Sequence, residues 1–248
     1  MIVNNNLYFN VSCYNMNMQQ YFVNEKLSVN TLIDLNEEIL KHTKVVLRKK
    51  DGYKFRVIDV ENQCFLVELK DNQALVLEYI EEDHELPIDV TVVMSLIKNE
   101  KFDLTLQKLT ELGVKRIVPF SANRSIIKIK DEDKKIERFK KIVTEASEQC
   151  HREVVPEITN VANLKDIEKY MSKYNYIAYE KEETHPLPFR DVDDSLTVVI
   201  GPEGGFEKSE VEALEAMGFE CKTLGKRILR AETAAIFVMS NIVGVFEL

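Results

Sequence analysis

The chain has 248 residues, of which 45% are hydrophobic and 30% are charged, a composition typical of a folded globular protein. Its formal net charge of -9 argues against a protein that coats nucleic acid indiscriminately, although a local basic surface remains possible. The four cysteines include no Cys-x-x-Cys pair, which argues against structural zinc and a disulfide framework and favours a reducing compartment.

The first 17 residues are rich in asparagine and lack the basic segment and apolar core of a secretory signal. We expect residues 1–17 to form a flexible N-terminal extension. No apolar run in the chain approaches the roughly 18 residues of a membrane span. The sequence therefore predicts a cytoplasmic protein with no membrane partner.

The segment that follows is predicted to be a small β-rich domain. A helical pattern precedes three runs of alternating apolar and polar residues, at 53–60, 64–69 and 74–80, which indicate a β-meander. A basic cluster between Lys41 and Arg56 is opposed only by Asp51. Such a cluster suits nucleic acid, but a solvated surface is the equally simple alternative.

Beyond Pro87 the pattern changes to apolar strands that alternate with helices. We expect strands at 88–97, 116–120, 174–179, 196–200 and 219–224, and helices at 101–112, 134–150 and 232–246. This alternation is typical of a parallel sheet covered on both faces, so the larger domain is predicted to be α/β. The last helix is apolar nearly all round and must be buried in a core or a subunit interface.

Five of the eight glycines fall between Gly201 and Gly225, in or near two loops that each follow a predicted strand. Ligands bind parallel sheets beyond the carboxyl ends of their strands, and glycine allows the backbone to approach a ligand closely. The two loops therefore predict a ligand pocket, with tight turns in a packed domain as the alternative. A phosphate-binding G-x-x-x-x-G-K-[ST] motif is not met, because Glu207 precedes Lys208 and Ser209.

Two segments, VVIGPEGGFEKSEVEAL and LGKRILRAETAAIFVMSNI, together resemble the paired C-terminal motifs of the ribosomal small-subunit methyltransferase E family. This family belongs to the knotted SPOUT superfamily of RNA methyltransferases. FDLTLQKLTELGVKRIVPF and EASEQCHREVVPEI agree as well, and the resemblance runs from about Met18 to the end of the chain. It implies a small PUA-like β-barrel domain over residues 18–86 and a SPOUT α/β domain with a parallel sheet and a C-terminal trefoil knot over residues 87–248.

The resemblance also implies the reaction. A homodimer would use S-adenosylmethionine to methylate ring nitrogen 3 of one uridine of 16S rRNA, near the decoding centre of the small ribosomal subunit, without a metal. The cofactor-binding residues that the two loops supply would be Gly201, Pro202, Glu203, Gly204, Gly205, Leu224, Gly225, Ile228 and Leu229.

Candidates for catalysis and for RNA binding come from charged residues around these motifs. Guanidinium groups suit phosphate oxygens, or a uracil oxygen that gains charge, although many arginines only form surface ion pairs. Glu232 could accept the imide proton, but a carboxylate there equally suits the first turn of a helix. The catalytic candidates are Arg124, Arg152, Arg230 and Glu232, and the RNA-binding candidates are Arg48, Lys49, Lys50, Arg124, Gln149 and Arg152. Gln149 and Arg152 are three residues apart, so we expect them to be neighbours on one helix face.

The sequence departs from the family pattern in places that do not include the glycine loops. Gln19 and Gln20 stand where the family commonly has arginine, and Asp51-Gly52 replaces the more usual Gly-Asp order. Two alternatives stay open: another SPOUT methyltransferase, acting on tRNA or on a ribose 2′-oxygen, and a non-catalytic rRNA-binding assembly factor.

Overall fold

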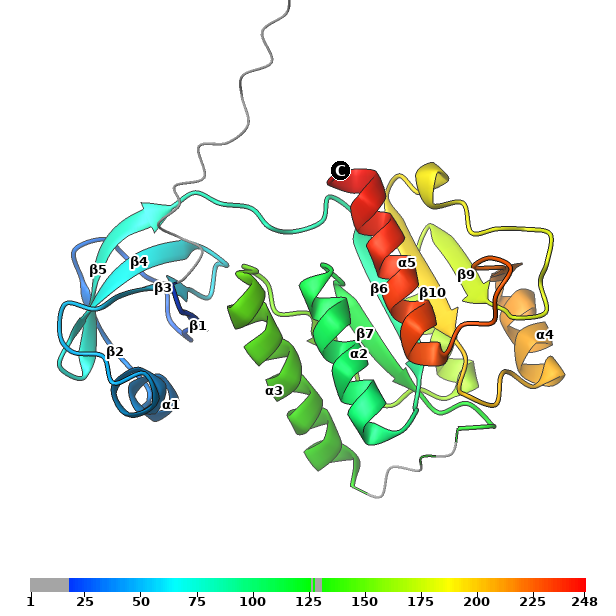
Figure 1. Ribbon diagram of the computed structural model, residues 1–248, viewed down its shortest axis with the longest axis horizontal. Coiled ribbons are helices and arrows are strands. Elements are labelled where there is room, and N and C mark those ends of the chain that lie inside the picture. The colour runs from blue at the N-terminus through cyan, green and yellow to red at the C-terminus, as the bar shows by residue number, and fades with distance from the viewer. Residues whose placement is uncertain (1–17, 126, 128–130) are drawn as a thin grey trace, which may run out of the picture. The chain divides into compact units, whose positions relative to one another are not determined.

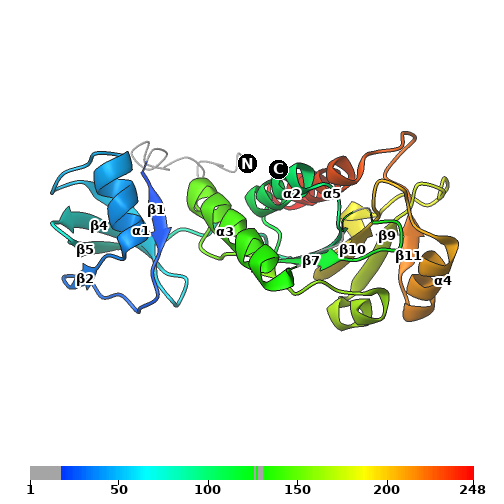
Figure 2. The same ribbon diagram turned by 90° about the horizontal axis from the view of Figure 1, so that it is seen from below.

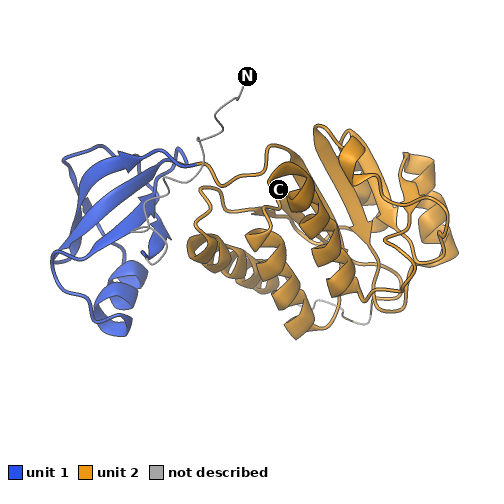
Figure 3. Ribbon diagram, turned by 45° about the horizontal axis from the view of Figure 1, so that its top comes forward, with its two compact units in different colours: residues 1–82 blue, residues 83–248 orange. Residues whose placement is uncertain are grey.

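The computed structural model describes residues 18–125, 127 and 131–248. The chain divides into two compact units, residues 1–82 and 83–248 (Figure 3). The sequence-based boundary between residues 86 and 87 lies a few residues further along the chain. The expected N-terminal extension, residues 1–17, falls outside the described residues.

The first unit contains a five-stranded sheet with the order β1-β3-β4-β5-β2. Alternate residues of the strands, such as Phe55 and Val57, are fully buried in a core of their own, as the alternating pattern predicts. A short helix, α1 (Glu37–Leu40), continues as a π-helical segment, Lys41–Val46. The strands are β1 (Gln20–Phe22), β2 (Leu32–Asp34), β3 (Lys54–Ile58), β4 (Cys64–Lys70) and β5 (Gln73–Ile80).

The second unit contains a six-stranded sheet with the order β11-β9-β10-β6-β7-β8, in which every pair of neighbours is parallel. This confirms the predicted parallel α/β sheet. Leu196 to Ile200 in the central strand are all buried, because helices cover both faces. The strands are β6 (Asp89–Ser95), β7 (Arg116–Phe120), β8 (Glu157–Ile158), β9 (Tyr174–Ala178), β10 (Ser195–Ile200) and β11 (Glu220–Lys222).

Helices cover the two faces of this sheet unequally (Figures 1 and 2). One face carries α2 (Asn99–Glu111), α3 (Glu132–Cys150) and α5 (Ala231–Phe246), and the other carries α4 (Lys208–Met217) and a 3-10 helix, Leu164–Tyr170. A further 3-10 turn, Phe189–Asp191, packs beside α5.

The apolar α5 is buried as its sequence predicts. Val238, Met239 and Ile242 have no exposed surface and belong to the core between the sheet and α2. Within the described residues, no helix combines the length and the apolar character that crossing a bilayer requires.

Two glycines of the second unit provide a matched test of backbone strain. Gly218 ends α4 with φ of 107°, a left-handed conformation that disfavours side chains. We expect Gly218→Ala to lower the free energy of unfolding by about 1 kcal/mol. Gly244→Ala should raise it by about 0.5 kcal/mol, because alanine favours the helix and its Cβ would meet nothing within 4 Å. Urea denaturation measures both, and shifts of the same sign would contradict the expectation.

Candidate functional site

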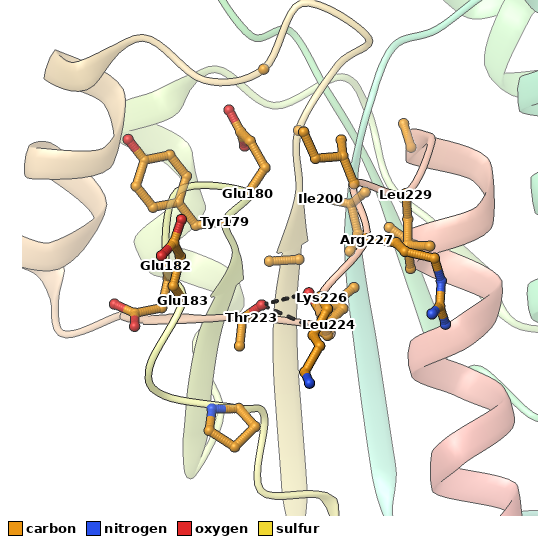
Figure 4. A pocket seen from close by; sticks show the side chains of 18 of the residues that line it. Tyr179, Glu180, Glu182, Glu183, Ile200, Thr223, Leu224, Lys226, Arg227 and Leu229 are labelled. Carbon is orange, nitrogen blue, oxygen red and sulfur yellow. Dashed lines mark hydrogen bonds between the residues drawn. The ribbon is translucent and has the colours of Figure 1, made fainter.

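A cavity of about 700 Å³ opens beyond the carboxyl ends of β9, β10 and β11 (Figure 4). The strand register explains its position, since Ala178 pairs with Ile200 on one side and with Lys222 on the other. The three strands thus end in one row, and the loops that follow them line the cavity together with the first turns of α5. A cavity of this size suits a small-molecule ligand of the size of a nucleoside derivative.

The loop after β10 brings its backbone to the cavity at two glycines, Gly201 and Gly205. Gly205 has φ of 67°, and a Cβ on it would lie 2.7 Å from Oε1 of Glu180. A Cβ on Gly201 would lie 3.0 Å from the Phe206 ring. The backbone N–H of Gly205 donates to the carbonyl of Pro202 at 2.9 Å, which closes the turn.

The loop after β11 forms the opposite wall. Its turn is held by Thr223, whose hydroxyl donates to the carbonyl of Gly225 and accepts from its N–H, each at 3.2 Å. Ile228 follows with 83% of its surface exposed, although it is apolar. An exposed isoleucine on a cavity wall offers apolar contact to a ligand.

Seven of the nine predicted cofactor-binding residues line this cavity: Gly201, Pro202, Gly205, Leu224, Gly225, Ile228 and Leu229. Glu203 and Gly204 belong to the same loop but are not among the lining residues. The two glycine loops that the sequence singled out therefore meet in space.

An acidic wall, formed by Glu180, Glu182 and Glu183 after β9, was missed in the sequence analysis. Glu182 accepts hydrogen bonds from the Thr184 hydroxyl and from the backbone N–H groups of Thr184 and His185, which lower its pKa to about 2. Glu180 and Glu183 have no hydrogen-bond or ion-pair partner in the described part of the chain. The signal was available, because three carboxylates follow a predicted strand at the end that carries ligand sites.

A basic wall faces the acidic one. Lys226 and Arg227 belong to the loop after β11 and are exposed, and Figure 4 shows them across the cavity from Glu182 and Glu183. A cavity with separate negative and positive walls suits a zwitterionic ligand better than a ligand of one charge.

Arg124 lies beside the first glycine loop but is not among the residues that line the cavity. Its Nη1 donates to the carbonyl of Gly204 at 3.2 Å, and its Nε lies 3.7 Å from Oε1 of Glu207. Half of the side chain, 51%, stays exposed, so the guanidinium can still contact another molecule.

Comparison with known proteins identifies the family. An RNA methyltransferase domain model matches residues 84–243. The ribosomal RNA small subunit methyltransferase E of Mesomycoplasma hyopneumoniae is 32% identical over 90% of this chain and 98% of the relative, and that of Bacillus subtilis is 33% identical over 91% and 96%. The chain belongs to the ribosomal RNA small subunit methyltransferase E family.

Solved structures agree with this assignment. The methyltransferase E of Neisseria gonorrhoeae, bound to S-adenosylmethionine, is 28% identical with a TM-score of 0.83, over 92% of this chain and 98% of the other. A Legionella pneumophila protein in complex with the same cofactor is 27% identical, also with a TM-score of 0.83, over 92% and 97%. The similarity to members of the methyltransferase E family thus extends over both units of the chain.

In this member of the family, Arg152 does not lie at the cavity. Its spacing from Gln149 predicted one shared helix face, but α3 ends at Cys150, and His151 turns away with φ of 64°. Gln149 stays exposed, whereas only 4% of the Arg152 side chain is exposed. The Arg152 guanidinium binds the carboxylate of Glu85 and the carbonyls of Thr110 and Val114, a structural arrangement that occupies most of its donors.

Glu232 and Arg230 lie at the start of α5. Burial opposes ionisation of Glu232, but a hydrogen bond from Lys101 and backbone N–H contact outweigh it, so the pKa of Glu232 is lowered. A carboxylate with a lowered pKa is a poorer proton acceptor, which favours the helix-turn interpretation over the role of a general base. Arg230 is exposed at the N-cap position.

The three basic candidates of the first unit are all exposed. Arg48 adopts φ of 54° directly after the π-helical segment, and the Lys49 ammonium lies 4.8 Å from the centre of the Tyr53 ring. Arg48, Lys49 and Lys50 therefore form a continuous exposed basic turn of that unit.

Arg152→Met separates a structural role from an RNA contact. We expect it to lower the free energy of unfolding by about 3 kcal/mol, because the carboxylate of Glu85 and two carbonyls lose their partner. Gln149→Ala on the exposed side of α3 serves as the control and should change stability by less than about 0.5 kcal/mol. Chemical denaturation measures the free energy of unfolding of both variants. If Arg152→Met kept its stability but bound RNA more weakly, the result would contradict the structural role and support the predicted RNA contact.

Proposed function

We propose that the protein is an S-adenosylmethionine-dependent methyltransferase that modifies ring nitrogen 3 of a specific uridine in 16S rRNA of the small ribosomal subunit, in the cytoplasm. The observation that carries the proposal is the cavity between two glycine loops in a chain of the methyltransferase E family. Two solved structures that resemble this chain over 92% of its length hold S-adenosylmethionine.

The residues present fit this cofactor. Gly201 and Gly205 line the cavity without side chains, so their backbone groups can contact the ligand directly. Ile228, Leu229 and Ala234 offer apolar surface for the adenine. The acidic wall suits the positive ammonium and sulfonium groups, and the basic wall of Lys226 and Arg227 suits the carboxylate.

S-adenosylmethionine, when bound, supplies a methyl group that the sulfonium already activates, so the protein chiefly has to align donor and acceptor. The uracil imide must lose its proton to solvent water before nitrogen 3 can accept the methyl group. Exposed guanidinium groups beside the loops would stabilise the resulting anion through the uracil oxygens. We assign this role to Arg124, which contacts Gly204, and to Arg230 at the start of α5.

We further propose that the first unit is a PUA-like barrel that binds rRNA through Arg48, Lys49 and Lys50. Its five-stranded sheet and the exposed basic turn support this assignment. Contacts from such a turn to phosphates would position the RNA without reading its sequence.

We also propose that the second unit is a SPOUT domain with a C-terminal trefoil knot, and that it works as a homodimer. The close contacts around β11 support the knot: the N–H of Thr223 donates to the carbonyl of His185 at 2.9 Å, while the carbonyl of Lys222 accepts from Tyr179. Residues 222 and 223 thus lie between two parts of the segment that follows β9, before the chain enters α5.

The substrate is tested by mass mapping of 16S rRNA from cells that lack the gene. We expect one 3-methyluridine to disappear and to return when the wild-type gene is restored. Return of a methyl group at a tRNA position or on a ribose oxygen would instead support another SPOUT activity, and an unchanged modification profile would refute the substrate assignment.

Glu180→Gln tests the acidic wall. S-adenosylmethionine carries one more positive charge than its product S-adenosylhomocysteine, so loss of the carboxylate should weaken binding of the donor about threefold and leave the product nearly unchanged. Isothermal titration with both ligands measures the ratio. Glu212→Gln, on the exposed side of α4, is the control. Equal weakening of both ligands would contradict a charge effect.

A further inference from the structure

Glu210 is a buried carboxylate with no role in the proposed reaction. Glu210 lies in the first turn of α4 with 1% of its surface exposed. Its Oε1 accepts the backbone N–H of Asn123 at 2.8 Å, and its Oε2 accepts the backbone N–H of Glu207 at 2.9 Å. One carboxylate therefore joins the loop after β7 to the loop after β10.

The position explains why a charge is tolerated there. The N-terminus of a helix favours negative charge, and each oxygen of Glu210 accepts from a backbone N–H. The bond to Glu207 completes a capping box, which many helices have. The bond to Asn123 goes beyond capping, because it joins residues that are 87 positions apart in the chain.

Further contacts between the two loops surround this bond. The side-chain amide of Asn123 donates to Oε2 of Glu207 at 3.0 Å, and Arg124 donates to the carbonyl of Gly204 at 3.2 Å. A Cβ on Gly204 would lie 3.3 Å from Cβ of Arg124, so the stem of the arginine lies directly on the glycine loop. The absence of a side chain at Gly204 thus leaves room for Arg124 to pack on the loop. This explains the glycine at residue 204, which does not line the cavity.

We propose that Glu210 is a positioning residue for Arg124: it holds the backbone of the preceding residue so that the guanidinium projects over the glycine loop toward the RNA. The proposal rests on the proposed function, which gives Arg124 its role at the substrate. We call the hydrogen bonds that join Glu210, Asn123 and Glu207 the clasp. A guanidinium that is already held in place loses less conformational freedom when the RNA binds. The clasp therefore strengthens RNA binding without contacting the RNA.

The clasp itself is tested by hydrogen exchange in Glu210→Gln, without any need for activity. Glutamine is neutral and has one acceptor oxygen beside a donor amide, so the hydrogen bonds to both backbone N–H groups are weakened and at most one of them is kept. We expect peptides that contain Asn123 to exchange about tenfold faster, while the buried strand β10 stays protected. Glu212→Gln, two residues away on the exposed side of α4, should leave exchange unchanged.

A double-mutant cycle then tests whether Glu210 acts through Arg124. Glu210→Gln should raise KM for the rRNA substrate about fivefold in the wild-type background, with little change in the affinity for S-adenosylmethionine. In the Arg124→Ala background, the same change should have little further effect, because the residue it positions is gone. An equal effect in both backgrounds would mean that Glu210 is merely structural and would overturn the proposal.

The outcomes separate this proposal from the function on which it rests. A wild-type protein that methylates no rRNA would refute the proposed function and the role of Arg124 with it. Methylation that is intact, with Asn123 exchange unchanged in Glu210→Gln, would overturn the positioning role alone. If Glu210→Gln fails to fold, Asn123→Ala removes the bond to Glu207 from the same clasp and should raise the same KM by about twofold.

Discussion

The parallel register of β9, β10 and β11 is the constraint on which the site depends. Ala178, Ile200 and Lys222 pair in one row across the three strands, so the loops that follow them must emerge side by side. The loops need no side-chain contacts with one another to be placed together, because the backbone hydrogen bonds of the sheet fix the positions at which the loops begin. Burial of the central strand β10 on both faces protects that register, since a slip by one residue would exchange the two cores.

Around this frame, the three loops supply different chemistry. The loop after β10 gives close backbone approach through Gly201 and Gly205, and the loop after β11 gives apolar and basic side chains. The loop after β9 gives carboxylates, one of which is held ionised by Thr184 and His185. The cavity can thus distinguish charge as well as shape. Arg124 comes from a fourth loop and contacts Gly204, and the buried carboxylate of Glu210 binds the backbone N–H of the preceding residue, Asn123.

The sequence could predict the parallel sheet, the buried α5 and the meeting of the two glycine loops, because each depends on periodicity or on turn chemistry within a short stretch. The prediction of a common helix face for Gln149 and Arg152 was wrong. His151 ends α3 in a left-handed conformation, and the sequence has no glycine there that would indicate the end of the helix. Glu180 was also missed, although the position of this residue directly after a predicted strand was a signal; only the fold shows that its carboxylate lies against the glycine loop 25 residues further on.

By itself, the sequence determined most of the strands and the long helices of the second unit, and which loops can bring their backbone close to a ligand. Only the tertiary structure decided the burial of Arg152, the ion pair of Glu232 with Lys101 and the clasp between Glu210 and Asn123. The reason is physical: periodicity and propensity act between near neighbours in the chain, whereas the role of a charged side chain is set by whichever partner folding brings to it. A charge that pairs across 87 residues leaves no local pattern in the sequence.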